Sequence, residues 1–260
     1  SVHRDDPVFD GQFSNLCYQN AVRQAFFDFS NKAERAGRIK PGTDKPFTEQ
    51  WSRIIMHLPY AYQAKRMFPD VFRHDREHTD MWNDVVEAIG PMPSQPESTD
   101  ADALNAWERE KDAYRRLISK TPQYTEFHAS RIEKGQRASS LIGNQYTGSI
   151  FLALMSTFES DLEDNSNLDN AMFGMCGYGS GAKAKVFEGK VSPRWREVVA
   201  SWHLFERLAG RMAIDHITYE NLHKGTQDNS VIEPKGEFAL VDIGEEGVDE
   251  GARRYRWIKA

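Results

Sequence analysis

The sequence predicts an α/β fold in which helices pack on a mixed β-sheet, and three patterns along the chain support this prediction. Apolar side chains recur at three- and four-residue steps between residues 18 and 33, which is the period of an amphipathic helix. An apolar run at residues 51–57 has the length of a buried strand. Two further strand-like runs, at 171–176 and 182–191, are separated by glycines and predict a β-hairpin. We expect residues 1–260 to form one domain.

The first helix is expected to begin near Ser14, because serine caps helix N-termini well, and to end near Gly37. The buried strand is expected to end at His57, just before Pro59, and a helix over about residues 60–67 follows it.

Residues 69–122 differ in composition from the rest of the chain, and we interpret them as a helical and loop insertion. Prolines and small polar residues gather between residues 91 and 99, which indicates a loop, and residues 101–120 have the charge pattern of an exposed helix. Further along, the periodicity predicts helices at 125–139, 150–158 and 204–224, and two closing strands at 237–243 and 254–258.

Composition and charge exclude several classes of protein. The net charge of −6 argues against a general nucleic-acid binder, which would present excess Lys and Arg to phosphates. No apolar run reaches the roughly 18 residues of a membrane span and no leader is recognised, so we expect a cytoplasmic protein. Its two cysteines, Cys17 and Cys176, are too few for a disulfide framework and are expected to be inert buried thiols.

The glycine-rich stretch from Met175 to Phe187 looks at first like a phosphate-binding loop. Such a loop must lead from a strand into a helix, whereas here a second strand follows and no Lys-Ser/Thr pair is present. A hairpin turn is the simpler interpretation. Glycines also let backbone N–H groups approach a ligand, so Ser180 could direct an amide or hydroxyl at a developing oxyanion.

The pair His74 and His78 has the i, i+4 spacing of two metal ligands on a helix. Its neighbours are highly charged and no third ligand is apparent, so we interpret the segment as solvated and predict no metal site.

Three segments together resemble the C-terminal half of 3-hydroxy-3-methylglutaryl-CoA synthase, a family of thiolase-fold condensing enzymes. The first is FDGQFSNLCY at residues 9–18, and the second is MHLP at residues 56–59. The third pairs GNQYTGS at residues 143–149 with GYGSG at residues 177–181. The resemblance covers most of the chain outside residues 69–122. It implies a thiolase-like half that acts on acetyl-CoA and acetoacetyl-CoA, without a further cofactor.

The resemblance also implies roles for three residues. His57 would hydrogen-bond the acetoacetyl ketone and protonate the alkoxide that forms there, a role that suits an imidazole titrating near neutrality. Asn144 would hydrogen-bond within the acetoacetyl site, and the Ser180 amide would help to hold a thioester oxygen. Taken singly, each residue has a simpler interpretation, as a core histidine, a helix cap and a turn residue respectively.

Other positions would shape the site or bind substrate. By the same resemblance Tyr146, Tyr178, Gly179 and Gly181 would line it. Two positions depart from the family pattern. Tyr62 stands where the family usually has a lysine near the CoA, leaving Lys65 and Arg66 as candidate CoA contacts, and Gly177 replaces a common serine.

The family's cysteine nucleophile and glutamate base belong to its N-terminal half, and this chain starts beyond both. We therefore expect a separate N-terminal polypeptide that carries them, inactivity without it, and further dimerisation of the pair. Three alternatives stay open: a ketoacyl synthase, a synthase that acts on carrier-protein-bound substrates in polyketide β-branching, and a non-catalytic scaffold subunit.

Overall fold

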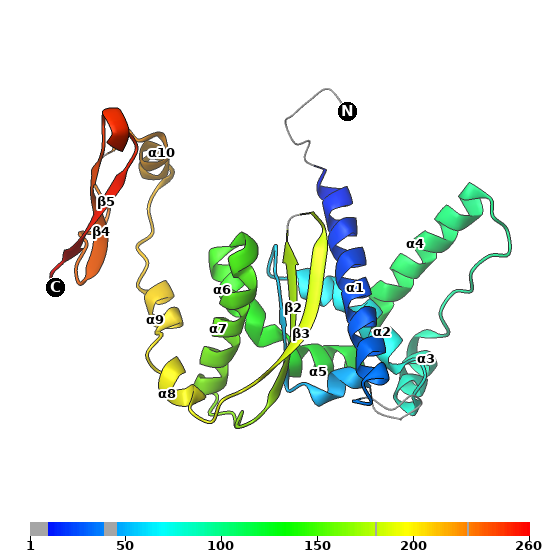
Figure 1. Ribbon diagram of the computed structural model, residues 1–260. Coiled ribbons are helices and arrows are strands. Elements are labelled where there is room, and N and C mark those ends of the chain that lie inside the picture. The colour runs from blue at the N-terminus through cyan, green and yellow to red at the C-terminus, as the bar shows by residue number, and fades with distance from the viewer. Residues whose placement is uncertain (1–9, 39–45, 180, 228) are drawn as a thin grey trace. The chain divides into compact units, whose positions relative to one another are not determined.

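The computed structural model describes residues 10–38, 46–179, 181–227 and 229–260 (Figure 1). The chain forms two compact units, which divide between Leu208 and Ala209. The first unit contains a three-stranded sheet with the helices packed on it, and the second contains a helix and a two-stranded hairpin.

The sheet of the first unit is mixed, as predicted. Its strands are β1 (Arg53–Met56), β2 (Met172–Gly179) and β3 (Lys183–Lys190), in the order β1-β2-β3. β1 runs parallel to β2, with Met56 opposite Cys176, and β2 and β3 form the predicted antiparallel hairpin. Because β1 and β2 are parallel, the residues that follow β1 lie beside the last residues of β2.

The glycines of the hairpin have two different functions. Gly177 and Gly179 lie inside β2 rather than in the turn, so the prediction that all of these glycines form the turn is wrong. The turn includes Gly181 and Ala182, both with positive φ (76° and 52°), and β3 begins only at Lys183. Ser180 lies outside the described residues.

Helix α1 (Gly11–Arg35) crosses the hairpin on one face and contacts β2 and β3 (Figure 1). Its N-cap is Asp10 rather than the expected Ser14, because the Asp10 carboxylate accepts hydrogen bonds from the backbone N–H groups of Gln12 and Phe13, both at 3.0 Å. A carboxylate at this end also interacts favourably with the helix dipole. The buried face of α1 carries Tyr18, Val22, Phe26 and Ala33.

Helix α2 (Gln63–Arg76) is longer than the predicted helix because it continues through Pro69. A proline at this position cannot donate a hydrogen bond to the carbonyl of Lys65, four residues earlier. The hydroxyl of Tyr124 donates to that carbonyl instead, at 3.0 Å. The apolar stripe of α2 therefore continues beyond the proline into the core, through Val71 and Phe72.

Replacing Tyr124 with Phe should lower the free energy of unfolding by about 1–3 kcal/mol, because the Lys65 carbonyl would lose its partner in a partly buried hydrogen bond. In a Pro69→Ala background the new N–H can donate to that carbonyl, so the same substitution should cost less. Urea unfolding of the four proteins measures both costs. Equal costs in the two backgrounds would show that Tyr124 does not compensate for the proline.

Residues 69–122 pack on the rest of the unit. After α2 come α3 (Asn83–Ile89) and α4 (Ala101–Ile118), and α4 agrees with the predicted charged helix. Tyr114 and Ile118 of α4 belong to the same apolar core as Phe72 and Trp82. Whether the whole segment is an insertion stays a prediction.

The helix predicted at 125–139 is in fact two helices, α5 (Pro122–Arg131) and α6 (Glu133–Ile142), which meet at Ile132. The next predicted helix is confirmed and is longer, as α7 (Ser149–Glu163). Arg53 anchors α7 to β1, since its Nε and Nη2 donate to the Asp161 carboxylate at 2.9 and 2.5 Å.

The helix predicted at 204–224 is wrong, because residues 210–215 are not helical. The chain forms α8 (Trp195–Val199) and α9 (Leu204–Ala209), and α10 (His216–Lys224) starts within the second unit. Asp215 caps α10 by accepting from the backbone N–H of Thr218 at 2.7 Å, which explains why a new helix begins there.

The second unit contains the two predicted closing strands, β4 (Glu237–Ile243) and β5 (Arg253–Ile258), as an antiparallel pair. Phe238 lies opposite Trp257 and Leu240 opposite Tyr255, so one face of this hairpin is apolar.

Candidate active site

His57 directly follows β1, and its backbone is held at both ends. Its N–H donates to the carbonyl of Cys176 at 2.8 Å, and its carbonyl accepts from the hydroxyl of Tyr18 at 2.6 Å. The residue is only 6% exposed, yet the imidazole Nδ1 has no hydrogen-bond partner among the described residues. Buried polar atoms are rarely left without a partner, so this ring nitrogen is a candidate ligand contact.

Two tyrosine rings surround the imidazole. The ring centroids of Tyr18 and Tyr178 lie 6.3 and 5.9 Å from that of His57, and the two tyrosines contact each other edge to face at 4.8 Å. Burial lowers the pKa of His57, so the neutral imidazole predominates at pH 7. Burial also raises the pKa of Tyr18 and of Tyr178, so both hydroxyls keep their protons.

Asn144 lies in the loop between α6 and α7. Its Oδ1 accepts from the backbone N–H of Tyr146 at 2.7 Å and from the Ser149 hydroxyl at 3.3 Å. The side chain therefore orders the loop that precedes α7, but Asn144 does not cap that helix, whose N-cap is Gly148 without a side-chain hydrogen bond. These bonds use only the acceptor end of the amide, and the Nδ2 donor has no partner within the described part of the chain. Asn144 is exposed, so this donor is available to a ligand.

The C-terminal ends of β1 and β2 lie next to the start of α7. A short 3-10 helix, η3 (Tyr146–Gly148), follows Asn144 and contacts β2. Gly177 on β2 follows Cys176, whose carbonyl accepts the hydrogen bond from the backbone N–H of His57. A Cβ atom added at Gly177 would lie 3.9 Å from Cδ1 of Ile150 on α7. The space would accept the serine that the family commonly has. The structure thus brings His57, Tyr178 and the start of α7 to one end of the sheet.

Tyr146 is 80% exposed and has a positive φ of 49°, an uncommon backbone conformation for a tyrosine. It extends from the same end of the sheet. Close to it along the chain, Leu141, Ile142 and Phe151 are also exposed, and Phe151 is 63% exposed. We call these four residues the α6–α7 patch. An exposed apolar group of this size beside a candidate site is typical of a surface that another protein covers.

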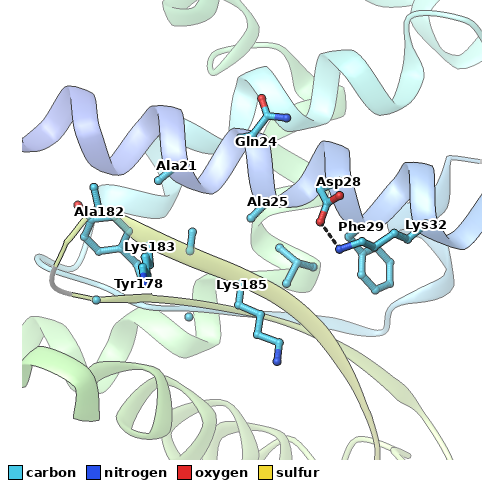
Figure 2. Close-up of a pocket in the computed structure, with 14 residues that line it drawn as sticks. Ala21, Gln24, Ala25, Asp28, Phe29, Lys32, Tyr178, Ala182, Lys183 and Lys185 are labelled. Carbon is cyan, nitrogen blue, oxygen red and sulfur yellow. Dashed lines mark hydrogen bonds and ion pairs between the residues drawn. The ribbon is translucent and has the colours of Figure 1, made fainter.

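A cavity of about 950 Å³ lies between α1 and the hairpin, and Figure 2 shows α1 passing over the strands that line it. Tyr178 and Gly179 line its glycine end. At the other end Lys32 pairs with Asp28 at 2.6 Å. Small side chains on α1, at Ala21 and Ala25, leave this space open; their four-residue spacing was the only sequence signal for it.

Lys65 and Arg66 lie on a different surface, in a groove of about 610 Å³ between α2 and α4. Arg66 lies over the ring of Tyr60, with its guanidinium carbon 5.6 Å from the ring centroid. The sequence interpretation missed the contribution of α4 to this groove, and it missed Tyr18, which it treated only as an apolar position of α1.

The two thiols differ in burial, and Cys176 is not suited to act as a nucleophile. Cys176 is fully buried on β2, and burial raises the pKa of its thiol well above the ordinary value, so no thiolate forms near neutral pH. Cys17 on α1 is also a free thiol but is only half-buried, so the prediction of a buried thiol is wrong for it.

The structure places the two histidines of the i, i+4 pair in different surroundings. His74 is the third residue from the end of α2. Its Nδ1 lies 3.3 Å from Oε1 of Glu77, and its ring packs tilted against that of Phe27, with the ring centroids 3.9 Å apart. His78 lies beyond the end of the helix. Over the described ranges, no group of three His, Cys, Asp or Glu side chains is placed to hold a metal ion. None of the helices described is both long and apolar enough to cross a bilayer.

A family model described as "Hydroxymethylglutaryl-coenzyme A synthase C terminal" matches residues 2–235. The chain belongs to the hydroxymethylglutaryl-CoA synthase family. Among its curated relatives, the hydroxymethylglutaryl-CoA synthase of Haloferax volcanii is 26% identical over 97% of this chain and 54% of its own length. Hydroxymethylglutaryl-CoA synthase erg13A of Aspergillus fumigatus is 24% identical over 84% of this chain and 45% of its own length. The chain thus spans about half the length of these synthases and corresponds to their C-terminal domain.

Solved structures of the family share the fold. "MvaS in complex with 3-hydroxy-3-methylglutaryl coenzyme A" aligns with a TM-score of 0.69 and 24% identity, over 100% of this chain and 54% of that one. The curacin pathway HMG synthase "in Complex with Holo Donor-ACP" aligns with a TM-score of 0.62 and 19% identity, over 98% of this chain and 53% of that one. These similarities confirm the predicted resemblance and the thiolase-like α/β fold.

Proposed function

We propose that this chain is the half of a hydroxymethylglutaryl-CoA synthase that binds the acetoacetyl thioester and completes its condensation with acetyl-CoA. The observation that carries the proposal is the imidazole of His57, which is buried, neutral and unpartnered at Nδ1 although its backbone is fixed at both ends. A core histidine would be expected to have its ring nitrogens satisfied.

In the condensation, the methyl carbon of the acetyl group attacks the ketone carbon of acetoacetyl-CoA, and the ketone oxygen becomes an alkoxide. The neutral imidazole of His57 donates a hydrogen bond to that oxygen. The glutamate base of the N-terminal half takes the proton that leaves the methyl carbon. As negative charge develops on the ketone oxygen, it raises the proton affinity of the nearby ring, so the imidazole gives its N–H proton to the alkoxide and takes up a replacement proton at its other nitrogen, which leaves it neutral. The tyrosine rings of Tyr18 and Tyr178 hold the imidazole and exclude water from it.

Asn144 supplies a second donor. Its Oδ1 is used within the loop, so the Nδ2 group faces the ligand and stabilises the developing negative charge. The Ser180 amide would act on the thioester oxygen, a role that rests on the family resemblance alone. Tyr146, Tyr178, Gly179 and Gly181 shape the site, and no group beyond the CoA thioesters is required.

The cysteine nucleophile and the glutamate base come from an N-terminal half, which we propose to be a separate polypeptide without which this chain is inactive. The raised pKa of Cys176 supports this, because that thiol cannot form the acyl-enzyme. The α6–α7 patch next to Asn144 is the surface we assign to the partner, and we expect the two-chain complex to dimerise further. Free thiols in this chain are in keeping with a reducing cytoplasm.

Affinity purification from the native cells tests the partner. We expect a second polypeptide in a one-to-one ratio, and mass spectrometry should find one of its cysteines acetylated after incubation with acetyl-CoA. A Phe151→Asp variant should lose the partner, because the carboxylate would be buried in an apolar contact, whereas Phe13→Asp, at an equally exposed phenylalanine (64%) on α1, should retain it. A stable monomer with no associated polypeptide would contradict the proposal.

A further inference from the structure

The hydrogen-bond ladder between β1 and β2 stops at His57. In a parallel pair the bonds are evenly spaced, and each inward-facing residue of one strand bonds two residues of the other. The N–H of His57 makes the first of its two bonds, to the carbonyl of Cys176 at 2.8 Å. The second would run from the N–H of Tyr178 to the His57 carbonyl, and no backbone N–H of the described residues makes it. Strand pairing therefore holds His57 at its N–H alone.

The hydroxyl of Tyr18 takes the place of the missing bond. It donates to the His57 carbonyl at 2.6 Å, in a buried hydrogen bond between residues 39 positions apart. Tyr18 is 2% exposed, and burial raises its pKa, so the hydroxyl keeps the proton that it donates. A side chain from α1 thus holds the end of the strand that carries the histidine.

The chain that follows His57 has few other means of holding this peptide. Pro59 has no N–H to donate, and it restricts Leu58 to extended backbone conformations. Without the Tyr18 hydroxyl, the His57 carbonyl would be a buried acceptor with no donor, which is costly. The peptide would turn toward water, and the imidazole of the same residue would move with it.

The ring of Tyr18 contributes separately from its hydroxyl. It contacts the ring of Tyr178 edge to face, with the centroids 4.8 Å apart, a favourable geometry for aromatic pairs. A phenylalanine at position 18 would keep this contact and lose only the hydrogen bond. The hydroxyl can therefore be tested without removing the packing around it.

We infer that Tyr18 is a positioning residue for the condensation, because its hydroxyl fixes the His57 peptide and so directs the imidazole at the ketone oxygen. This inference rests on the proposed function and deepens it, since it adds α1 to the elements that determine the geometry of the site. Tyr18 acts through His57 and has no assigned contact with the substrate. Misplacement of a catalytic group by about 1 Å can reduce a rate about a hundredfold, so a loosened imidazole should be costly.

Chemical modification of the full chain tests whether the hydroxyl holds His57. Diethyl pyrocarbonate acylates neutral imidazoles, and peptide mass spectrometry gives the rate at each histidine. In Tyr18→Phe we expect His57 to react about tenfold faster, because the local structure that buries it opens more often. His128 on α5, which is 3% exposed, should react at the wild-type rate and so report that the rest of the core is intact.

Tyr114→Phe is the matched control. Tyr114 on α4 is 5% exposed, and its hydroxyl donates to the carbonyl of Gly90 at 2.9 Å. The substitution removes the same kind of hydrogen bond far from His57 in the sequence, so His57 should react at the wild-type rate. An unchanged rate at His57 in Tyr18→Phe, or equal acceleration at His57 and His128, would overturn the inference.

Kinetics of the complex of the two halves test whether this positioning serves the reaction. Tyr18→Phe should lower kcat for condensation about tenfold and leave acetylation of the partner's cysteine unchanged, whereas Tyr114→Phe should change neither. In a His57→Gln background, Tyr18→Phe should cause no further loss, because both changes act through one imidazole. A residue that only stabilises the fold would slow both steps, or add its own loss in the His57→Gln background.

The inference and the proposed function fail differently. If Tyr18→Phe exposes His57 to modification but the wild-type complex makes no condensation product, the hold of the hydroxyl on His57 stands and the proposed function is wrong. If the wild-type complex condenses and Tyr18→Phe condenses equally fast, the proposed function stands and the positioning role is wrong.

Discussion

His57→Ala is expected to reduce condensation by the complex of the two halves at least about a hundredfold, since general acid–base groups contribute roughly 10²–10⁴ to the rate. The variant loses both the donor to the ketone oxygen and the group that carries the proton to the alkoxide. Acetylation of the partner's cysteine should continue, because that step does not involve the ketone. Rapid-quench measurement of acetyl-enzyme and of product separates the two steps.

A second variant at this position separates the two functions of the imidazole. His57→Gln retains an N–H donor but cannot carry a proton at neutral pH, so we expect KM for acetoacetyl-CoA to recover while kcat stays low. If His57→Ala condenses at the normal rate, the histidine is only a core residue.

Asn144→Asp is expected to reduce condensation by about 10²–10³-fold, the usual cost of removing one donor from an oxyanion site. The aspartate keeps the oxygen that accepts from Tyr146 and Ser149, so the loop and the start of α7 should remain ordered. It loses the Nδ2 donor and places a negative charge where negative charge develops.

The structural interpretation of Asn144 predicts a different outcome. If the residue only caps the loop, the aspartate should preserve activity, and Asn144→Ala should be the damaging change. Thermal unfolding of both variants, alongside rapid-quench assays of condensation, distinguishes a lost donor from a lost cap.

The elements that the sequence predicted best are those whose pattern is local. The period of α1 and the strand-like runs on both sides of Gly181 depend on which faces are buried, and burial is visible in the order of apolar residues. The same pattern placed His57 at the end of a buried strand, one residue beyond the last residue of β1, Met56.

Other features depend on partners far along the chain. The residues near Pro69 do not indicate that α2 continues, because the hydroxyl that donates to the Lys65 carbonyl belongs to Tyr124, far along the chain. Tyr18 fits an apolar pattern, and only the fold reveals that its hydroxyl holds the backbone of His57. The groove forms because α4 lies against α2, so Arg116 could not be assigned to it from spacing.

Reconstitution from two separately purified halves tests the central claim most directly. This chain is mixed with an N-terminal half that carries the cysteine and the glutamate, and hydroxymethylglutaryl-CoA is measured after addition of acetyl-CoA and acetoacetyl-CoA. We predict product only when both halves are present, and none when this chain carries His57→Ala. Product from either half alone, or no product from an associated pair whose cysteine is acetylated, would contradict the account.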